Sequence, residues 1–324
     1  MPEYKDQSPD VPSSAPTFGV VIVNWNNPAE TMACIKTLDE AEPAPSHVVV
    51  VDNGSLDDSV AQLEAWADEH WIWRVGQGDG IPWLVIARAG ANRGFAGGTN
   101  VGIRYLQQRT TLSHFLLLNN DASIAPDFLA EIASAIARYP TAGLLTGTIF
   151  EDPARDRVWY AGGTENSLRA LMQHKHDVPE SADPVPTEFI SGCAMVVSRE
   201  LLESIGALAE CYFPAYWEDG EYSHRARKAG FPVLYVPNAV AYHKVGASVG
   251  AADISLELES TKNRLRVFFV RRNYSGLRKT AALAYLAVTK PGRAVLETVK
   301  GKPKSGWAIL RGTFSGFVSQ AAKR

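Results

Sequence analysis

Residues 115–121 read Phe115-Leu116-Leu117-Leu118-Asn119-Asn120-Asp121, so a run of apolar residues stops abruptly at polar ones. A short apolar run bounded by polar residues is typical of a buried β-strand. In open α/β sheets the ligand crevice lies beyond the carboxyl ends of the strands. Asp121 is therefore a candidate ligand-binding carboxylate, although an Asp at a strand end is also a common turn former.

Similar apolar runs recur along the chain and alternate with segments of helical pattern. The predicted strands are Gly19–Val23, His47–Val51, Trp83–Ala87, His114–Leu118, Leu144–Ile149, Ala194–Val197 and Val233–Val236. The predicted helices among them are Pro28–Glu40, Ser59–His70, Thr99–Gln108, Pro126–Tyr139 and Arg199–Ile205. Continuous apolar strands are typical of a sheet buried on both faces. The alternation predicts an α/β fold with a doubly wound, mostly parallel sheet.

The composition, 46% hydrophobic and 21% charged, is typical of a soluble globular protein. No apolar run approaches the roughly 18 residues of a transmembrane helix. Residues 1–17 lack the apolar core of a signal peptide and are expected to be a disordered tail. The three cysteines have no CxxC spacing, which indicates a reducing cytosol and neither a disulfide framework nor a zinc site.

The net charge of −3 conceals a strong asymmetry. From Lys262 to the end there are 15 Lys and Arg residues and one acid, Glu297, so the preceding chain carries about −17. A basic end of this kind suits an anionic membrane or nucleic acid. The chain contains no recognisable nucleic-acid-binding motif, so nucleic acid is not an expected partner.

The basic end is expected to be helical over Leu256–Arg272 and Leu277–Thr289, with Pro291 as a break. Aromatic residues such as Trp307 and Phe314 then interleave with Lys and Arg, as in a helix that lies in a membrane interface. A helical hairpin packed on the sheet with solvated charges is the alternative. The expected organisation is a tail over 1–17, a main domain over 18–250 and a basic helical extension over 251–324.

Polar residues also follow the first two predicted strands. Asn24 and Asn26 follow the first strand without the glycines that a Rossmann dinucleotide site needs, which argues against NAD or FAD. Asp52 ends the second strand and can accept hydrogen bonds from a nucleotide base or a ribose. A glycine-rich stretch from Asn92, containing Arg93 and Gly94, precedes a predicted helix. Free backbone N–H groups, a helix N-terminus and an arginine suit a phosphate group.

Two later segments carry further candidates. Trp217, Glu218 and Asp219 place acids beside an aromatic ring, although acids are also common at helix N-termini. His243 follows the last predicted strand. A single His is more often structural than a ligand, but Asp121 offers it a partner for a divalent metal.

Together these segments resemble the family 2 glycosyltransferases of the GT-A fold, especially the bacterial rhamnosyltransferase-like branch. The likeness extends from about Phe18 to Ser248. It depends on residues 51–55, 92–100, 118–121, 191–195 and 217–219.

The resemblance implies a role for each candidate. Asp219 matches the catalytic base, and Asp121 and His243 match ligands of Mg²⁺ or Mn²⁺. Asn119 stands where the family's DxD motif has its first acid, so the metal has fewer charged ligands. The residues implied to bind the donor are Asn24, Asn26, Asp52, Asn92, Arg93, Gly94, Asn120 and Asp121. Those implied to bind the acceptor are Gly192, Trp217 and Glu218.

The implied activity is inverting, metal-dependent transfer of a sugar in bacterial surface polysaccharide synthesis. The favoured donor is dTDP-rhamnose, with a UDP-linked sugar also considered. The acceptor is linked to a polyprenyl diphosphate or is a saccharide, and the enzyme is expected on the cytoplasmic face of the membrane. Basic residues from Lys262 to Arg272 contact either an anionic membrane or the acceptor's diphosphate. The alternatives are a sugar nucleotidyltransferase, which should carry a Gly-rich, Arg-containing loop after the first strand, and a non-catalytic scaffold.

Overall fold

The computed structural model describes residues 15–70, 80–244 and 252–319. The chain divides into two compact units. The sheet unit comprises Met1–Gly163, His174–Pro214 and Glu218–Val245, and the helical unit comprises Thr164–Gln173, Ala215–Trp217 and Gly246–Arg324. The predicted tail lies outside the described residues except for 15–17, as does the predicted domain boundary at 250.

The sheet unit is built on one ten-stranded sheet. Its strands are β1 (Phe18–Asn24), β2 (His47–Asp52), β3 (Leu84–Arg88), β4 (His114–Asn119), β5 (Ala122–Ile124), β6 (Leu144–Glu151), β7 (Val158–Tyr160), β10 (Val185–Pro186), β11 (Ala194–Ser198) and β12 (Val233–His243). The order is β10-β12-β6-β11-β4-β1-β2-β3, with β5 paired to β12 and β7 to β6. β4, β1, β2 and β3 are parallel, as are β6 and β12, whereas β11 runs antiparallel between β4 and β6.

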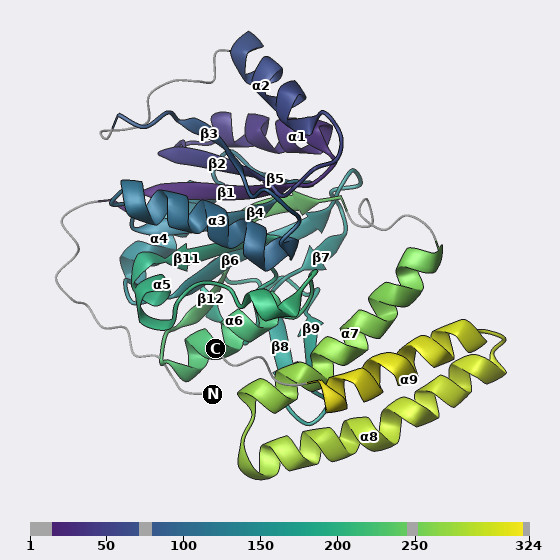
Figure 1. Ribbon diagram of the computed structural model, residues 1–324. Helices are drawn as coiled ribbons and strands as arrows, with labels where there is room; N and C mark the ends of the chain where they lie inside the picture. Colours follow the sequence, from purple (N-terminus) through teal and green to yellow (C-terminus); the bar gives the residue numbers. More distant parts are fainter. Residues whose placement is uncertain (1–14, 71–79, 245–251, 320–324) are drawn as a thin grey trace. The chain divides into compact units, whose positions relative to one another are not determined.

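Helices cover both faces of this sheet (Figure 1). They are α1 (Pro28–Asp39), α2 (Ser59–Glu69), α3 (Gly94–Arg109), α4 (Phe128–Arg138), α5 (Arg199–Ile205) and α6 (Glu218–Lys228), with a short 3₁₀ turn at Glu210–Tyr212. Side chains of α3, α5 and α6 share one core with Val21, Val51 and Phe115 of the strands. The prediction of an α/β fold with a mostly parallel sheet is confirmed.

Helix α3 begins earlier than predicted. The sequence predicts a helix from Thr99, but α3 starts at Gly94, so the following glycines lie within the helix. A Cβ on Gly98 would lie 2.9 Å from Val23 Cγ1, and one on Gly102 would lie 2.4 Å from Val21 Cγ1. Each glycine in a helix costs about 1 kcal/mol relative to Ala. Here the absence of side chains at Gly98 and Gly102 allows α3 to approach the sheet closely, and this packing offsets the cost.

In the described part of the helical unit there are three helices and most of a two-stranded hairpin, whose outer residues Gly163 and His174 belong to the sheet unit. They are α7 (Ala252–Asn273), α8 (Gly276–Val299), α9 (Pro303–Val318), β8 (Gly163–Asn166) and β9 (Leu171–His174). The prediction that Pro291 ends a helix is wrong, because α8 continues through it. Pro291 is exposed, and Leu286 and Ala294 are buried on either side of it, so packing offsets the lost backbone hydrogen bond. Among the helices that the structure describes, none has the length and apolar character needed to cross a bilayer.

His114 makes the stability of the sheet unit sensitive to acid. It begins β4 and is 7% exposed, and burial lowers its pKa from 6.5 to about 4. The folded chain keeps the ring neutral while the unfolded chain takes up a proton, so stability is lost as pH falls from about 6.5 towards about 4. The unfolding free energy of the wild type should fall between about pH 7 and about pH 5. In His114→Gln we expect this fall to be smaller by about 2 kcal/mol.

Urea unfolding at the two pH values measures this difference. The matched control is His176→Gln, which replaces an exposed histidine and should keep the wild-type dependence on pH. An unchanged dependence in His114→Gln would contradict the assignment.

Candidate active site

The predicted site residues that follow β1, β2 and β4 lie at one edge of the sheet. Asn24 and Asp52 are paired at the carboxyl ends of β1 and β2. Asn119 at the end of β4 is paired with Val23. Asp121 comes two residues later. The parallel register therefore places Asp52 and Asp121 at the same edge.

Asp52 has an unsatisfied oxygen. The residue is 6% exposed, and its Oδ2 accepts a hydrogen bond from the Ser55 N–H at 3.4 Å. Its Oδ1 is buried and has no hydrogen-bond partner within the described part of the chain. An unpaired buried carboxylate oxygen costs about 1–3 kcal/mol or more. A ligand N–H or O–H at this position would remove that cost.

Asn24 and Asn26 hold the loops around Asp52. The Asn24 Oδ1 accepts a hydrogen bond from Thr31 Oγ1 at 2.8 Å, and its Nδ2 donates to Ser55 Oγ at 3.2 Å. The Asn26 Oδ1 accepts from the Leu56 N–H at 2.7 Å. The structure therefore gives both side chains a role in joining the loops after β1 and β2.

The loop before α3 is anchored by Asn53, which the sequence analysis missed. Asn53 is buried, its Oδ1 accepts from the Arg93 N–H at 3.0 Å, and its Nδ2 donates to the Gly94 carbonyl at 3.1 Å. The Asn92 Oδ1 accepts from the Gly94 N–H at 2.8 Å. Gly94 has φ +71°, and a Cβ there would lie 2.4 Å from the Pro214 carbonyl oxygen. Only glycine fits this turn, which fixes the start of α3.

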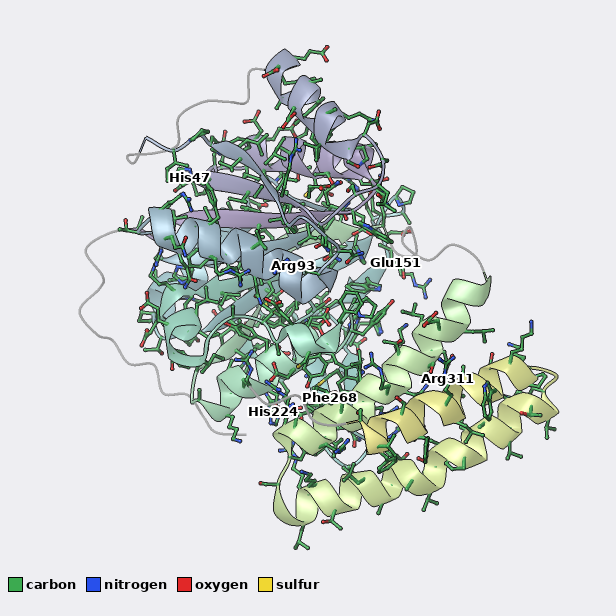
Figure 2. The ribbon with its side chains drawn as sticks, viewed as in Figure 1. His47, Arg93, Glu151, His224, Phe268 and Arg311 are labelled. Atoms are coloured by element: carbon green, nitrogen blue, oxygen red, sulfur yellow. The ribbon has the colours of Figure 1, made fainter. Side chains whose placement is uncertain are left out.

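Arg93 stands at the start of α3 with an exposed side chain (Figure 2). Its Nε donates to the Ala89 carbonyl at 3.3 Å. The guanidinium thus lies beside the first turn of a helix, where backbone N–H groups and the helix dipole favour an anion.

Asp121 and His243 form a close pair. The Asp121 Oδ1 lies 3.3 Å from His243 Nε2, and their side chains are 8% and 12% exposed. The pairing of β5 with β12 brings them together, because Ala122 lies opposite His243. The His243 ring lies 4.6 Å from the Trp159 ring, and its buried Nδ1 has no hydrogen-bond partner among the described residues. The predicted metal ligands are therefore adjacent.

This pair fits a divalent cation that shares its coordination with a substrate. No cluster of three or more His, Cys, Asp or Glu side chains suited to a metal occurs in residues 15–70, 80–244 and 252–319. A cation here would have two protein ligands, with phosphate oxygens and water in the other positions, as is common for Mg²⁺ at nucleotide sites. Asn120 is predicted to bind the sugar donor. In the structure its Nδ2 donates a hydrogen bond to Thr31 Oγ1 at 3.2 Å.

Asp219 lies next to the end of β4. Its Oδ2 accepts from the Gly192 N–H at 3.1 Å, and its Oδ1 accepts from the Gly220 N–H at 2.7 Å. Burial raises the pKa of its carboxyl above the ordinary value. Beside Gly192, the Cys193 carbonyl accepts from the Asn119 N–H at 2.9 Å.

Asp121 lies close to the same backbone segment. Burial, and after it the charge of Asp121, raise the pKa of the Cys193 thiol. Asp121 comes two residues after Asn119, whose N–H bonds the Cys193 carbonyl, and Asp219 accepts from the N–H of the neighbouring Gly192. The two acids, 98 residues apart in the sequence, occupy the same edge of the sheet.

The residues just before Asp219 have an unusual backbone. Tyr216 and Trp217 have φ of +81° and +77°, which is costly for residues with a side chain. Within the helical unit, the Trp217 ring lies 5.1 Å from the Phe269 ring and Lys262 Nζ lies 4.2 Å from the Tyr216 ring centroid. α7 therefore holds the strained segment. Glu218 is buried in the first turn of α6.

Comparison with known protein families matches residues 19–206 to the family described as Glycosyl transferase family 2. The low-salt glycan biosynthesis hexosyltransferase Agl10 of Haloferax volcanii is 26% identical over 220 residues, which are 65% of this chain and 62% of that protein. The dTDP-rhamnosyl transferase RfbF of Shigella flexneri is 24% identical and covers 86% of each chain. The N-acetylglucosaminyl-diphospho-decaprenol L-rhamnosyltransferase of Mycobacterium tuberculosis is 24% identical over 71% of this chain and 77% of that protein.

Solved structures show the same fold at low sequence identity. GalNAc-T7 with UDP, GalNAc and Mn²⁺ has a TM-score of 0.65 and 14% identity, covering 92% of this chain and 57% of that chain. The mannosyltransferase PcManGT of Pyrobaculum calidifontis with GDP-Man and Mn²⁺ has a TM-score of 0.57 and 18% identity, covering 98% and 91%.

Proposed function

The chain belongs to glycosyl transferase family 2 and has a GT-A type fold, and we propose that it transfers a sugar, with inversion, from a nucleotide diphosphate donor. One observation carries the proposal. The Asp121–His243 pair follows the end of β4, whose last residue Asn119 bonds the Cys193 carbonyl, and Asp219 accepts from the N–H of the neighbouring Gly192. The Asp121–His243 pair can hold the diphosphate end of a donor, and Asp219 can accept a proton from an acceptor.

The donor fits the residues after β2 and before α3. The unpaired Oδ1 of Asp52 accepts an N–H of the base or a ribose O–H. Arg93 and the first turn of α3 bind the diphosphate. A divalent cation, Mg²⁺ or Mn²⁺, bound by Asp121 and His243 would neutralise charge on the diphosphate.

Asp219 acts on the acceptor. Its carboxylate takes the proton of an acceptor hydroxyl, whose oxygen forms a bond to the anomeric carbon as the bond to the diphosphate breaks. The nucleoside diphosphate leaves with the electron pair. A single displacement by an acceptor opposite the leaving group inverts the anomeric carbon. The Gly192 and Gly220 N–H groups orient the carboxylate.

We propose dTDP-rhamnose as the donor, so that the transferred sugar is rhamnose. The proposed acceptor is linked to a polyprenyl diphosphate or is a saccharide, on the cytoplasmic face of the membrane. Two relatives support it by name, one a dTDP-rhamnosyl transferase and the other acting on a decaprenol-linked acceptor. UDP and GDP-mannose, bound in structures of similar fold, define the other donors to be tested.

Calorimetry with a panel of dTDP-, UDP- and GDP-linked sugars, with Mg²⁺ or Mn²⁺, tests the proposal. We expect dTDP-rhamnose to bind most tightly. Asp52→Ala leaves an N–H of the base or an O–H of the ribose without a hydrogen-bond partner. It should therefore weaken binding of the nucleotide sugar about 10-fold, which corresponds to a lost hydrogen bond of about 1.4 kcal/mol.

The control is Asp58→Asn, an exposed acid in the loop after β2, which should bind the donor as the wild type does. Absence of binding to every nucleotide sugar would overturn the proposed function. Tighter binding of a UDP- or GDP-linked sugar would overturn only the rhamnose assignment.

A further inference from the structure

Helix α8 presents an apolar face to solvent along its whole length. Its exposed residues recur at intervals of three, four and seven: Leu277, Ala281, Ala284, Val288, Val295 and Val299. Leu277 is 89% exposed and Val299 is 79% exposed. At 1.5 Å per residue, this face is about 33 Å long.

The two lysines of α8 point away from this face. Lys279 Nζ donates to the Arg271 carbonyl at 2.8 Å, and Lys290 Nζ donates to Asn263 Oδ1 at 2.5 Å, so both are directed towards α7. A surface helix of a globular protein ordinarily turns its apolar face inward and its charged face outward. α8 buries Leu286 and Ala294 but also leaves this second apolar stripe exposed, which indicates that its outer face meets something other than water.

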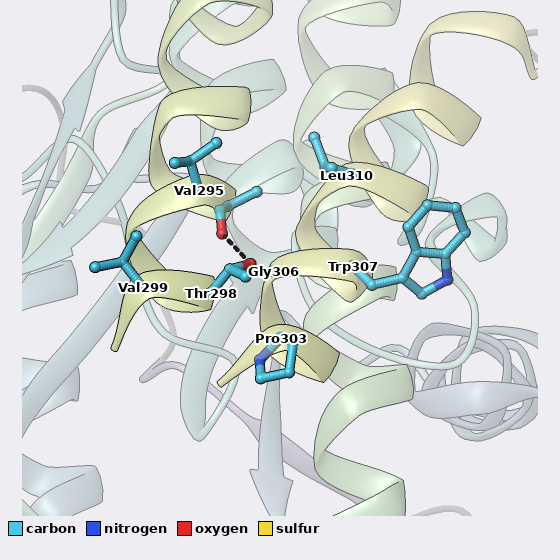
Figure 3. Close-up of a pocket in the computed structure, with 8 residues that line it drawn as sticks. Val295, Thr298, Val299, Pro303, Gly306, Trp307 and Leu310 are labelled. Atoms are coloured by element: carbon cyan, nitrogen blue, oxygen red, sulfur yellow. Dashed lines mark hydrogen bonds between the residues drawn. The ribbon is translucent and has the colours of Figure 1, made fainter. Parts of the chain in front are cut away.

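Helix α9 extends the same face. Trp307, Leu310, Phe314 and Val318 share one side of the helix, and Trp307 is 67% exposed. A groove of 270 Å³ runs between the helices and is lined by residues of both, including Val295, Val299, Trp307 and Leu310 (Figure 3). The groove joins the exposed apolar residues at the end of α8 to those at the start of α9. The exposed apolar residues of the two helices are here called the α8–α9 apolar face.

The charge around this face determines what it can bind. Residues 274–319 contain eight Lys and Arg and a single acid, Glu297. Lys300 and Lys302 lie in the turn between α8 and α9, and Lys304 and Arg311 flank Trp307; all four are exposed. A second copy of the chain would bring two such basic surfaces together across a two-fold axis, which like-charge repulsion disfavours. An anionic lipid surface complements both the charge and the apolar face.

We propose that α8 and α9 lie flat on an anionic bilayer, with Trp307 and Phe314 inserted at the boundary of headgroups and acyl chains. Lys300, Lys302, Lys304 and Arg311 contact lipid phosphates. This inference rests on the proposed function, since a lipid-linked acceptor requires an enzyme at the membrane, and it identifies the surface that meets the lipid. It assigns Lys300, Lys302, Lys304 and Arg311 to lipid.

Flotation of the full chain with phosphatidylcholine vesicles, with and without phosphatidylglycerol, tests the proposal. We expect binding that needs phosphatidylglycerol and is lost at high salt. The double variant Trp307→Ser/Phe314→Ser should lower the partition coefficient by at least about 10-fold, because each side chain loses its burial in lipid. Lys302→Glu/Lys304→Glu/Arg311→Glu should abolish the preference for phosphatidylglycerol.

The matched control is Leu56→Ser, which removes a side chain that is 91% exposed in the sheet unit and should float like the wild type. Circular dichroism and nucleotide-sugar calorimetry confirm that each variant is folded. The proposal would be overturned if vesicle binding did not depend on phosphatidylglycerol. It would also be overturned if both the Trp307→Ser/Phe314→Ser variant and the Lys302→Glu/Lys304→Glu/Arg311→Glu variant bound vesicles as the wild type does. So would dimerisation that the Trp307→Ser/Phe314→Ser change abolishes. Vesicle binding by a chain that binds no nucleotide sugar would overturn the proposed function and leave the membrane surface standing.

Discussion

Asp219→Asn is expected to lower turnover by about 10²- to 10⁴-fold and to leave donor binding intact. The carboxylate is the proposed proton acceptor, and the proposed donor-binding residues lie after β2, before α3 and after β4. An amide cannot take up the hydroxyl proton, although its oxygen can still accept the Gly192 N–H. Single-turnover rates report the chemical step, and calorimetry reports donor affinity.

Asp219→Glu separates catalysis from structure. Glutamate keeps a carboxylate but moves it by one methylene, so activity between those of Asp219→Asn and the wild type is expected. Thermal melting should show all three proteins folded. Wild-type turnover in Asp219→Asn would remove Asp219 from the reaction.

The environment of Asp219 also predicts the dependence of activity on pH. Burial raises the pKa of its carboxyl, and the base must be deprotonated to act. The acid limb of the kcat/KM profile should therefore fall at a pH above the ordinary Asp value of 3.8. This limb should be absent from the residual activity of Asp219→Asn.

The sheet could be predicted from sequence because its strands depend on local pattern. The continuous β-branched run from Val48 to Val51 has one plausible structure, and so does the apolar run that ends at Leu118. The start of α3 was missed because Gly94, Gly97 and Gly98 suggest a loop when read locally. Glycine is required at Gly94 and Gly98 because a Cβ would clash with distant parts of the chain, including Val23 and Pro214.

The site shows the same division between local and distant causes. Asp52, Asp121 and Asp219 stand at recognisable edges of apolar segments. Asn53 was missed because its partners, Arg93 and Gly94, lie some forty residues away in the sequence. Its position directly after Asp52 was the available signal. The extension of α8 past Pro291 likewise depends on packing by α7 and α9, which periodicity within one helix does not reveal.

Asp121→Ala is expected to weaken donor binding in the presence of Mn²⁺ by at least about 10- to 100-fold, a loss at least as large as that from altering groups around a metal ligand. Asp121 and His243, 3.3 Å apart, are the two proposed protein ligands of the cation. Removing the carboxylate leaves a single imidazole, which binds a hard cation poorly without anionic oxygen nearby. Donor affinity measured with a chelator present should be the same in the variant and the wild type.

Calorimetric titration of donor with and without Mn²⁺ makes the comparison without any turnover. The matched control is Asp156→Asn, an exposed acid of the sheet unit, which should keep the full effect of Mn²⁺. His243→Gln should lose part of the effect, because the remaining carboxylate still attracts the cation. If Mn²⁺ strengthens donor binding equally in Asp121→Ala and the wild type, then the cation is held elsewhere. The Asp121–His243 contact would in that case be an ion pair that fastens β12 to the end of β4.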